Sequence, residues 1–217
     1  MLNVLKNLQV SLYRETPSIE KRKVKKLIKS SASRVENLFR NLYGEKINIY
    51  EKVKRYVIRS IPKIKVYIID VWKFLTGKFR SIRELIREYS FKPYLGRYDA
   101  VSEEIEIDVE AVNKDPSIID HEHIHKAQDE ILKKSGYSLL KILRKYGGIG
   151  RAYVEGWAEY LREKISGMVS PAYKVFKDAY EKLISIYGNE KRVIEDLDNS
   201  IRVFARIACE DYFSKLY

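Results

Sequence analysis

Residues 119–129 read Ile-Asp-His-Glu-His-Ile-His-Lys-Ala-Gln-Asp. This stretch contains the pattern H-E-x-x-H as His121, Glu122 and His125. On a helix, residues four apart lie on one face with Cβ atoms roughly 5–6 Å apart, a separation that two imidazoles can close around one zinc ion. The chain has three histidines, and all of them fall between residues 121 and 125. This concentration indicates a metal site rather than a chance match.

The flanking residues predict where this helix begins and ends. Asn113-Lys114-Asp115-Pro116-Ser117 is typical of a helix start, with proline at an early helical position and Asp or Ser available as a cap. Gly136 is typical of a helix end. We therefore expect a helix from about residue 117 to about residue 134. Its apolar positions are Ile118, Ile119, Ile124, Ala127, Ile131 and Leu132.

A second predicted helix carries the acidic groups that such a site needs. Residues 151–165 include Glu155 and Glu159, which are one helical turn apart. A catalytic zinc takes three protein ligands and keeps one position open for water, and Glu155 is the candidate for the third ligand. Glu159 is placed to accept a hydrogen bond from the free ring nitrogen of a ligating histidine, which would fix the tautomer of that histidine.

Together these motifs resemble the gluzincin metallopeptidases, the thermolysin-like clan, in which H-E-x-x-H is followed on a later helix by E-x-x-x-[DE]. The small size of the chain is similar to that of the compact archaeal minigluzincins. The resemblance covers about residues 95–165. It implies that His121, His125 and Glu155 bind Zn²⁺ and that Glu122 is the general base.

The same resemblance implies two supporting acids. Glu159 takes the place of a family residue that is often Asp, and Asp129, one turn after His125, matches an acid of thermolysin-like helices. The function implied is that of a zinc-dependent metallopeptidase acting on peptides or unfolded protein. In that mechanism Glu122 removes a proton from a zinc-bound water and later delivers it to the leaving amine.

A further hydrogen-bond donor is expected to stabilise the oxyanion that forms during hydrolysis. The candidates on the last predicted helix are Tyr212 and Arg206, and Tyr153 and Tyr146 are closer to the site in sequence. The sequence does not choose among these four. At 100° per residue, His123 points about 200° away from the ligand pair, so we interpret it as a surface or supporting residue rather than a ligand.

The composition favours a folded protein of a reducing compartment. A chain of 217 residues with 45% hydrophobic and 33% charged residues suits one or two domains with a real core. The single cysteine, Cys209, excludes an internal disulfide and a cysteine-based zinc cluster, and we expect it to be buried on the last helix. The start of the chain lacks the apolar core of a signal peptide, and no run of 18 apolar residues occurs. The sequence therefore predicts a cytoplasmic protein, and its abundant Lys, Glu, Ile and Tyr favour a thermophile source.

The charge is divided unevenly along the chain. Residues 1–98 hold 24 Lys and Arg against 8 Asp and Glu, a net charge of +16, whereas residues 99–217 hold 18 against 22, a net charge of −4. We predict a basic helical region over residues 1–92 and a gluzincin-like zinc peptidase domain over residues 93–217. Apolar residues recur near the helical period in the first region. Its predicted helices span residues 18–43, 49–59 and 64–88.

The sequence leaves the role of the basic region open. Its densest run, Lys21-Arg22-Lys23-Val24-Lys25-Lys26, suits a solvated helix face, a nucleic-acid surface or attachment to an acidic membrane. The region could also be a pro-segment or lid, in which case a chain without residues up to about Phe91 should be more active. A DNA-binding half joined to the zinc unit would be similar in outline to Spartan-type repair proteases. The non-enzymatic alternative is a basic binding module in which zinc is a structural clamp. The oligomeric state is not predicted.

The remaining segments complete a mostly helical α+β fold. Apolar and acidic residues alternate over 101–109, and residues 96–99 precede them as a second predicted strand, so a hairpin leads into the zinc helix. In gluzincin-like folds such a sheet lies above the cleft, and its edge strand pairs with an extended substrate. A short helix over 138–146 and a flexible glycine-rich connection at 147–150 are expected before the second metal helix. Two further helices, at 171–187 and 190–217, are expected to pack against the base of the catalytic unit.

Overall fold

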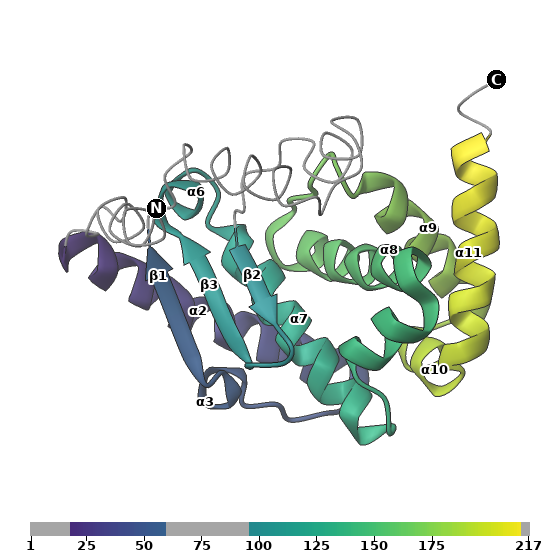
Figure 1. Cartoon of the computed structure of the whole chain (residues 1–217), viewed down its shortest axis with the longest axis horizontal. Coiled ribbons are helices and arrows are strands. Elements are labelled where there is room, and N and C mark those ends of the chain that lie inside the picture. Colours follow the sequence, from purple (N-terminus) through teal and green to yellow (C-terminus); the bar gives the residue numbers. More distant parts are fainter. Residues whose placement is uncertain (1–17, 60–95, 214–217) are drawn as a thin grey trace, which may run out of the picture.

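The computed structural model describes residues 18–59 and 96–213 of the chain. They form a mostly helical α+β fold with one three-stranded sheet (Figure 1). No helix in these two ranges is both long enough and apolar enough to cross a membrane. The helices are α2 (Ser18–Tyr43), α3 (Ile49–Lys52), α6 (Val109–Lys114), α7 (Ser117–Lys134), α8 (Leu139–Ser166), α9 (Lys174–Tyr187), α10 (Glu190–Glu195) and α11 (Leu197–Phe213). The strands are β1 (Arg55–Arg59), β2 (Gly96–Asp99) and β3 (Glu104–Asp108).

Helix α2 has the limits that the sequence predicted. It ends before Gly44, whose φ of +70° is a left-handed conformation that glycine adopts without steric cost. Its buried residues recur at helical spacing and form one apolar face, and the opposite face is charged and exposed. The buried face consists mainly of Val24, Ile28, Val35 and Phe39, each 2% exposed or less.

The sheet contains a strand where a helix was expected. The single helix predicted over residues 49–59 is wrong, because helicity stops after the one turn of α3 and the chain continues as β1. Strand β1 pairs in parallel with β3, so that Tyr56 lies opposite Ile105. The run Tyr-Val-Ile at 56–58 is rich in the aromatic and β-branched residues that favour strands. This pairing joins segments about fifty residues apart, so helical periodicity within residues 49–59 could not reveal it.

Strands β2 and β3 form the antiparallel hairpin that was predicted ahead of the metal helix. Ile105 and Ile107 of β3 are fully buried, whereas Glu104 and Glu106, which alternate with them, are half-buried. The turn of the hairpin occupies residues 100–103, so β3 begins three residues later than predicted. The strand order is β1-β3-β2, which leaves β2 at one edge of the sheet, beside α7.

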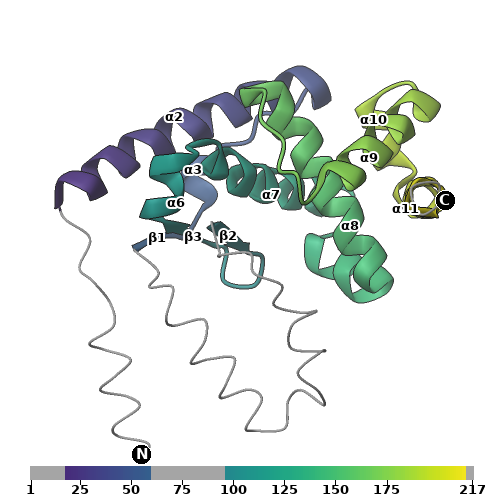
Figure 2. The same cartoon turned by 90° about the horizontal axis from the view of Figure 1, so that it is seen from above.

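Helix α7 lies between α2 on one side and the sheet on the other, and α8 packs across it (Figures 1 and 2). Helix α8 includes both segments that were predicted as separate helices. The glycine-rich connection between them is a kink at Gly147, with φ 55° and ψ −127°, rather than a loop. The helix predicted over residues 190–217 is two helices, α10 and α11, because the chain leaves helical geometry at Asp196.

The two sides of the predicted domain boundary share one hydrophobic core. Buried residues of α2, such as Phe39, belong to the same cluster as Trp157 of α8 and Phe204 of α11. Residues 18–59 are therefore an integral part of the fold around α7 and do not form a detachable lid. The helix predicted at 64–88 lies outside the described residues. Cys209 is exposed on α11, so the expectation that it is buried is wrong.

Candidate metal centre

Helix α7 is buried on every side. All of its residues from Ser117 to Leu132 are in the interior, although this segment contains three histidines and several acids. A buried polar or charged group destabilises the fold unless it finds a partner, so each of these side chains must be matched by another element. The surroundings of α7 supply these partners, and they hold the side chains of the H-E-x-x-H motif in fixed positions.

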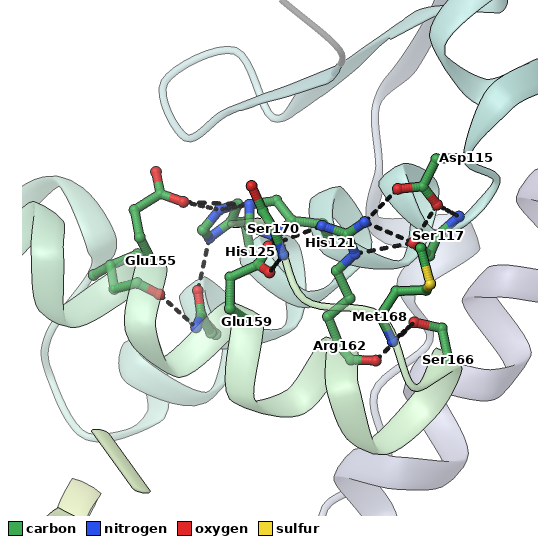
Figure 3. A network of polar contacts seen from close by, with 12 residues as sticks. Asp115, Ser117, His121, His125, Glu155, Glu159, Arg162, Ser166, Met168 and Ser170 are labelled. Atoms are coloured by element: carbon green, nitrogen blue, oxygen red, sulfur yellow. Dashed lines mark hydrogen bonds and ion pairs between the residues drawn. The ribbon is translucent and has the colours of Figure 1, made fainter. Parts of the chain in front are cut away.

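Three candidate ligand atoms meet between α7 and α8 (Figure 3). The Nε2 atoms of His121 and His125 are 2.9 Å apart. Oε2 of Glu155 lies 3.3 Å from Nε2 of His121 and 3.6 Å from Nε2 of His125. The structure thus brings together the three residues that the sequence nominated as metal ligands.

The partners of the two histidines orient their ring nitrogens. Nδ1 of His125 lies 2.8 Å from Oε1 of Gln128, whose amide nitrogen donates to the carbonyl oxygen of Val154 at 3.2 Å. Nδ1 of His121 lies 2.9 Å from Oε1 of Glu159, an ion-pair distance without the alignment of a regular hydrogen bond. Both Nδ1 atoms therefore carry the proton in the neutral rings, and both Nε2 lone pairs point at the same spot as the Glu155 carboxylate.

This arrangement fits a divalent cation. Two lone pairs and a carboxylate oxygen that face one another repel unless a positive charge lies among them. Oε2 of Glu155 is a buried atom without a hydrogen-bond partner in residues 18–59 and 96–213. Burial lowers the pKa of His121, but the carboxylates of Glu155 and Glu159 outweigh it and raise that pKa to about 10. A tetrahedral zinc with Zn–N bonds of about 2.0–2.1 Å holds neighbouring ligand atoms about 3.3 Å apart, close to the three separations found here. The donor set of two imidazoles and one carboxylate is one that zinc prefers.

A buried arginine neutralises the acid behind His121. Nη1 of Arg162 donates to Oε1 of Glu159 at 3.0 Å, and Nε of the same guanidinium donates to Oγ of Ser117 at 3.0 Å (Figure 3). The guanidinium also pairs with Asp115, just before the start of α7. The other oxygen of Glu159 accepts the backbone N–H of Ser170 at 2.6 Å. Glu159 is thus fixed on both sides, in the place behind His121 that the sequence predicted for it.

Glu122 lies between α7 and strand β2. Its carboxylate accepts a hydrogen bond from the backbone N–H of Tyr98. A Cβ atom at Gly96 would lie 2.9 Å from both Cγ and Oε1 of Glu122, so only glycine leaves room for this side chain. Burial raises the pKa of Glu122, and the nearby imidazoles of His121 and His125 oppose that shift. The strand therefore fixes the carboxylate beside the ligand pair.

Asp129 supports the site differently from the prediction. It accepts the backbone N–H of Leu139 at 3.0 Å and the hydroxyl of Tyr98 at 3.2 Å, and thereby ties the start of α8 and strand β2 to α7. The side chain that orients His125 is Gln128. Asp129 also belongs to a second acidic group, with Glu103 and Glu130. That group is already matched by lysine ammonium groups and so does not require a metal: Lys52, Lys54, Lys126 and Lys133.

A tyrosine that the sequence did not nominate lies beside the ligands. The ring of Tyr173 stacks on that of His121, with centroids 6.2 Å apart and planes inclined by 9°. Burial and then the charge of Glu155 raise the pKa of Tyr173 to about 12, so its hydroxyl keeps its proton at neutral pH. The segment after α8 brings it there, because Ser170 binds Glu159 and the N–H of Tyr173 donates to the carbonyl of Ser170 at 3.0 Å. The feature of the sequence that could have identified Tyr173 is its position soon after the helix that carries Glu155 and Glu159.

Three of the four predicted oxyanion donors, Arg206, Tyr146 and Tyr153, have described side chains, and none of the three is brought to the candidate ligands. Arg206 is exposed on α11, and the side chain of Tyr212 lies outside the described part of the chain. Tyr146 donates to Asp198 at 2.6 Å, and Tyr153 is buried among aromatic rings of the core.

His123 is fully buried, so of its two predicted roles, surface or supporting residue, the surface role is wrong, and it is not a member of the candidate ligand cluster. Its ring lies between Oγ of Ser31 at 2.8 Å and the hydroxyl of Tyr56 at 2.9 Å, where it joins α2 and β1 to the back of α7. Burial, with a smaller contribution from Arg34, lowers the pKa of His123 to about 3. It is a neutral structural residue and points away from the other two histidines.

No protein-family model, curated protein or solved structure matches the chain. The function of this protein is therefore inferred from the geometry of the site.

Proposed function

We propose that this protein is a zinc-dependent metallopeptidase that hydrolyses peptide bonds in peptides or unfolded protein. The observation that carries the proposal is the meeting of His121, His125 and Glu155 at one point, with Glu122 fixed beside them. Three protein ligands with an open fourth position are typical of catalytic zinc, whereas structural zinc sites are closed by four protein ligands. In the described part of the chain, these three residues are the only members of that cluster.

The side chains around the ligands prepare the site for a cation. Gln128 holds His125, and Glu159 holds His121, each in the tautomer that presents Nε2 to the metal. When bound, zinc would supply Lewis acidity, polarising the scissile carbonyl and acidifying a water molecule towards neutral pH. Because Arg162 balances the charge of Glu159, the site keeps that acid ionised in the interior without an excess of negative charge.

Glu122 is the general base in this proposal. Its carboxylate adjoins both ligating imidazoles but is held by strand β2 rather than by the ligand cluster, so it is available to a water molecule. It would take the proton from the attacking water and deliver it to the nitrogen of the leaving amine. The hydrogen bond from Tyr98 keeps the carboxylate oriented between these two steps.

Tyr173 is the oxyanion donor in this proposal, in place of Tyr212 and Arg206. Its hydroxyl remains protonated at neutral pH and its ring is fixed by stacking on His121. A fixed O–H group next to the reacting carbonyl would donate a hydrogen bond to the negative charge that develops on its oxygen. Tyr173→Phe should therefore lower kcat by about a hundredfold or more while zinc affinity stays unchanged.

Zinc content and peptide hydrolysis, measured on the same preparations, test the proposal. Glu122→Gln should keep one zinc per chain and lose hydrolysis, whereas His125→Ala and Glu155→Ala should lose the zinc. A chelator should abolish hydrolysis, and added zinc should restore it. The peptidase proposal would be refuted if the purified protein contained no zinc, or if the Glu122→Gln variant hydrolysed peptides as fast as the parent. If the protein binds zinc but cleaves none of a set of unfolded proteins, the result would instead support the alternative of a binding module in which zinc has a structural role.

The prediction of a latent enzyme concerns residues 1–92, of which the structure describes residues 18–59. The described N-terminal elements, α2 and β1, contact α7 through His123, on the side away from the ligand pair. They cannot act as a removable cover for the ligands.

A further inference from the structure

The first half of α2 presents a dense set of exposed cations. Six of the nine residues from 21 to 29 are Lys or Arg, and all six side chains are exposed. None of them forms an ion pair with a described residue, whereas Arg34, further along the helix, pairs with Asp120 at 2.7 Å. Figure 2 shows α2 along an outer edge of the described fold. We call this set the α2 basic face: Lys21, Arg22, Lys23, Lys25, Lys26 and Lys29.

The apolar side of α2 is not available to a membrane. Val24 and Ile28, which alternate with the cations, are buried against the core at 0% and 2% exposure. None of the exposed large hydrophobic side chains of the described fold belongs to α2. Amphipathic helices bind lipid surfaces by inserting their apolar face, so that mode of binding is closed to α2. What remains on its surface is a row of positive charges.

An open aromatic ring adjoins this row. The ammonium group of Lys29 lies 5.5 Å from the ring centroid of Tyr50 on α3, and Tyr50 is 41% exposed. The ring of Tyr50 also stacks on that of Tyr56, with centroids 5.8 Å apart and planes inclined by 25°. Stacking on Tyr56 holds Tyr50 in place at the surface of the described fold. Cations that follow a backbone, next to a fixed aromatic ring, are the features with which proteins bind single-stranded nucleic acids.

We propose that the α2 basic face and Tyr50 bind single-stranded nucleic acid. The cations contact successive phosphates along α2, and one base stacks on the free part of the Tyr50 ring. A base in a duplex is already stacked on its neighbours, so Tyr50 favours the single strand over the double strand. This inference is independent of the peptidase proposal, since none of these residues contacts the metal centre.

Binding can be measured by fluorescence anisotropy with the full-length chain and a labelled 15-nucleotide single strand. If about four phosphates are neutralised, log K should fall with log salt with a slope of about −3, that is about −0.7 per phosphate. The variant Arg22→Gln, Lys25→Gln, Lys26→Gln, Lys29→Gln should bind at least about tenfold more weakly in low salt and lose most of this slope. These side chains are exposed, so the variant should fold as the parent does.

A matched control removes the same charge from another part of the molecule. The variant Lys174→Gln, Arg192→Gln, Lys191→Gln, Arg202→Gln changes four exposed cations of α9, α10 and α11. It should bind the oligonucleotide within about twofold of the parent, because contact charges rather than net charge determine the slope. Equal weakening in the two variants would show that only net charge matters and would overturn the proposal.

Tyr50→Ala separates base stacking from charge. It should weaken binding of the single strand at least about fivefold, with little effect on the duplex of the same sequence. An unchanged affinity for the single strand would overturn the stacking role. Vesicles of phosphatidylserine and phosphatidylcholine complete the test: tighter binding to them than to the oligonucleotide, lost in the four-residue variant of α2, would identify a membrane surface and overturn the proposal.

Discussion

The indole N–H of Trp157 donates a hydrogen bond of 3.0 Å to the hydroxyl of Tyr43, although 114 residues separate them in the sequence. Tyr43 is the last residue of α2, and Trp157 lies two residues after the candidate ligand Glu155 on α8. The described part of the basic N-terminal half is thus joined directly to the helix that carries Glu155. Deleting residues up to about Phe91 would remove α2 and β1 from the core, so we expect loss of folding rather than a gain of activity.

Tyr43→Phe tests this connection. The variant leaves the fully buried indole N–H without its acceptor, which should lower the free energy of unfolding by about 1–3 kcal/mol. Urea denaturation measures the change. Tyr50→Phe, which removes a hydroxyl from an exposed ring, is the control and should change stability by less than about 0.5 kcal/mol. Equal stability of Tyr43→Phe and the parent would mean that the hydrogen bond contributes nothing.

Gln128 should control zinc affinity without binding zinc. Gln128→Ala removes the acceptor that orients Nδ1 of His125, so zinc affinity should fall by about 10–100-fold. Competition with a chromophoric chelator measures the dissociation constant. Gln128→Glu keeps an oxygen in reach of the ring and should recover most of the affinity. If both variants lose affinity equally, the side-chain oxygen at this position does not orient His125 and the orienting role is refuted.

Substitutions of Arg162 and Glu159 should have strongly non-additive effects on the free energy of unfolding. Arg162 is 6% exposed and Glu159 is fully buried, so Arg162→Met leaves a carboxylate in the interior without the guanidinium that donates to it at 3.0 Å. We expect a loss of about 3–5 kcal/mol of stability, measured by chemical denaturation. Adding Glu159→Gln removes the unpaired carboxylate charge and should restore part of the lost stability. A double variant with the simple sum of the two single losses would contradict the coupling.

Gly96→Ala should impair catalysis while leaving zinc in place. The added Cβ would meet the side chain of Glu122 at 2.9 Å and that of Ile118 at 3.0 Å, so the general base must shift. A displacement of this kind should lower kcat by about ten- to a hundredfold with zinc content unchanged. Gly148→Ala is the matched control, because a Cβ there meets nothing within 4 Å. Full activity of Gly96→Ala would show that the position of Glu122 is not critical.

Low pH should weaken the ion pairs between Glu103, in the hairpin turn, and its lysine partners. Hydrogen bonds from Lys133 and then Lys54 hold the pKa of Glu103 at about 2, below its ordinary value of 4.5. Because the folded-state pKa is the lower one, this contribution to stability is complete above about pH 4.5 and is lost as the pH falls towards 2. Glu103→Gln should be less stable at neutral pH and show a shallower loss over that range. Urea midpoints between pH 2 and 6 measure this, and parallel curves for the two proteins would refute it.

Local patterns predicted the parts of the site that one helix or one motif determines. The spacing of His121 and His125 on one helical turn is such a pattern, and the structure places Glu155 and Glu159 beside them as expected. The placement of Tyr173 depends on how the chain folds back after α8, through the contact between Ser170 and Glu159. No periodicity contains that information, so Tyr173 was not among the four candidates taken from the sequence.

In the fold, too, features set by local sequence were predicted and features set by distant contacts were not. The limits of α2 follow from its apolar face and from Gly44, which act within a few residues, and they were predicted correctly. Strand β1 exists because β3 offers it a parallel partner, and that contact is distant in sequence. The burial of His123 has the same origin, because Ser31 and Tyr56 reach it from α2 and β1.

The burial of α7 on all sides determines how the candidate metal site comes apart when the protein unfolds. A helix without a solvent-facing side has no route to fray locally along its middle, so its backbone amides should exchange with deuterium only through opening of the whole core. The most slowly exchanging amides of the protein should then be those around residues 121–125. On heating, the geometry of the ligands would persist until the molecule unfolds as a unit, and zinc release and unfolding would follow one common transition.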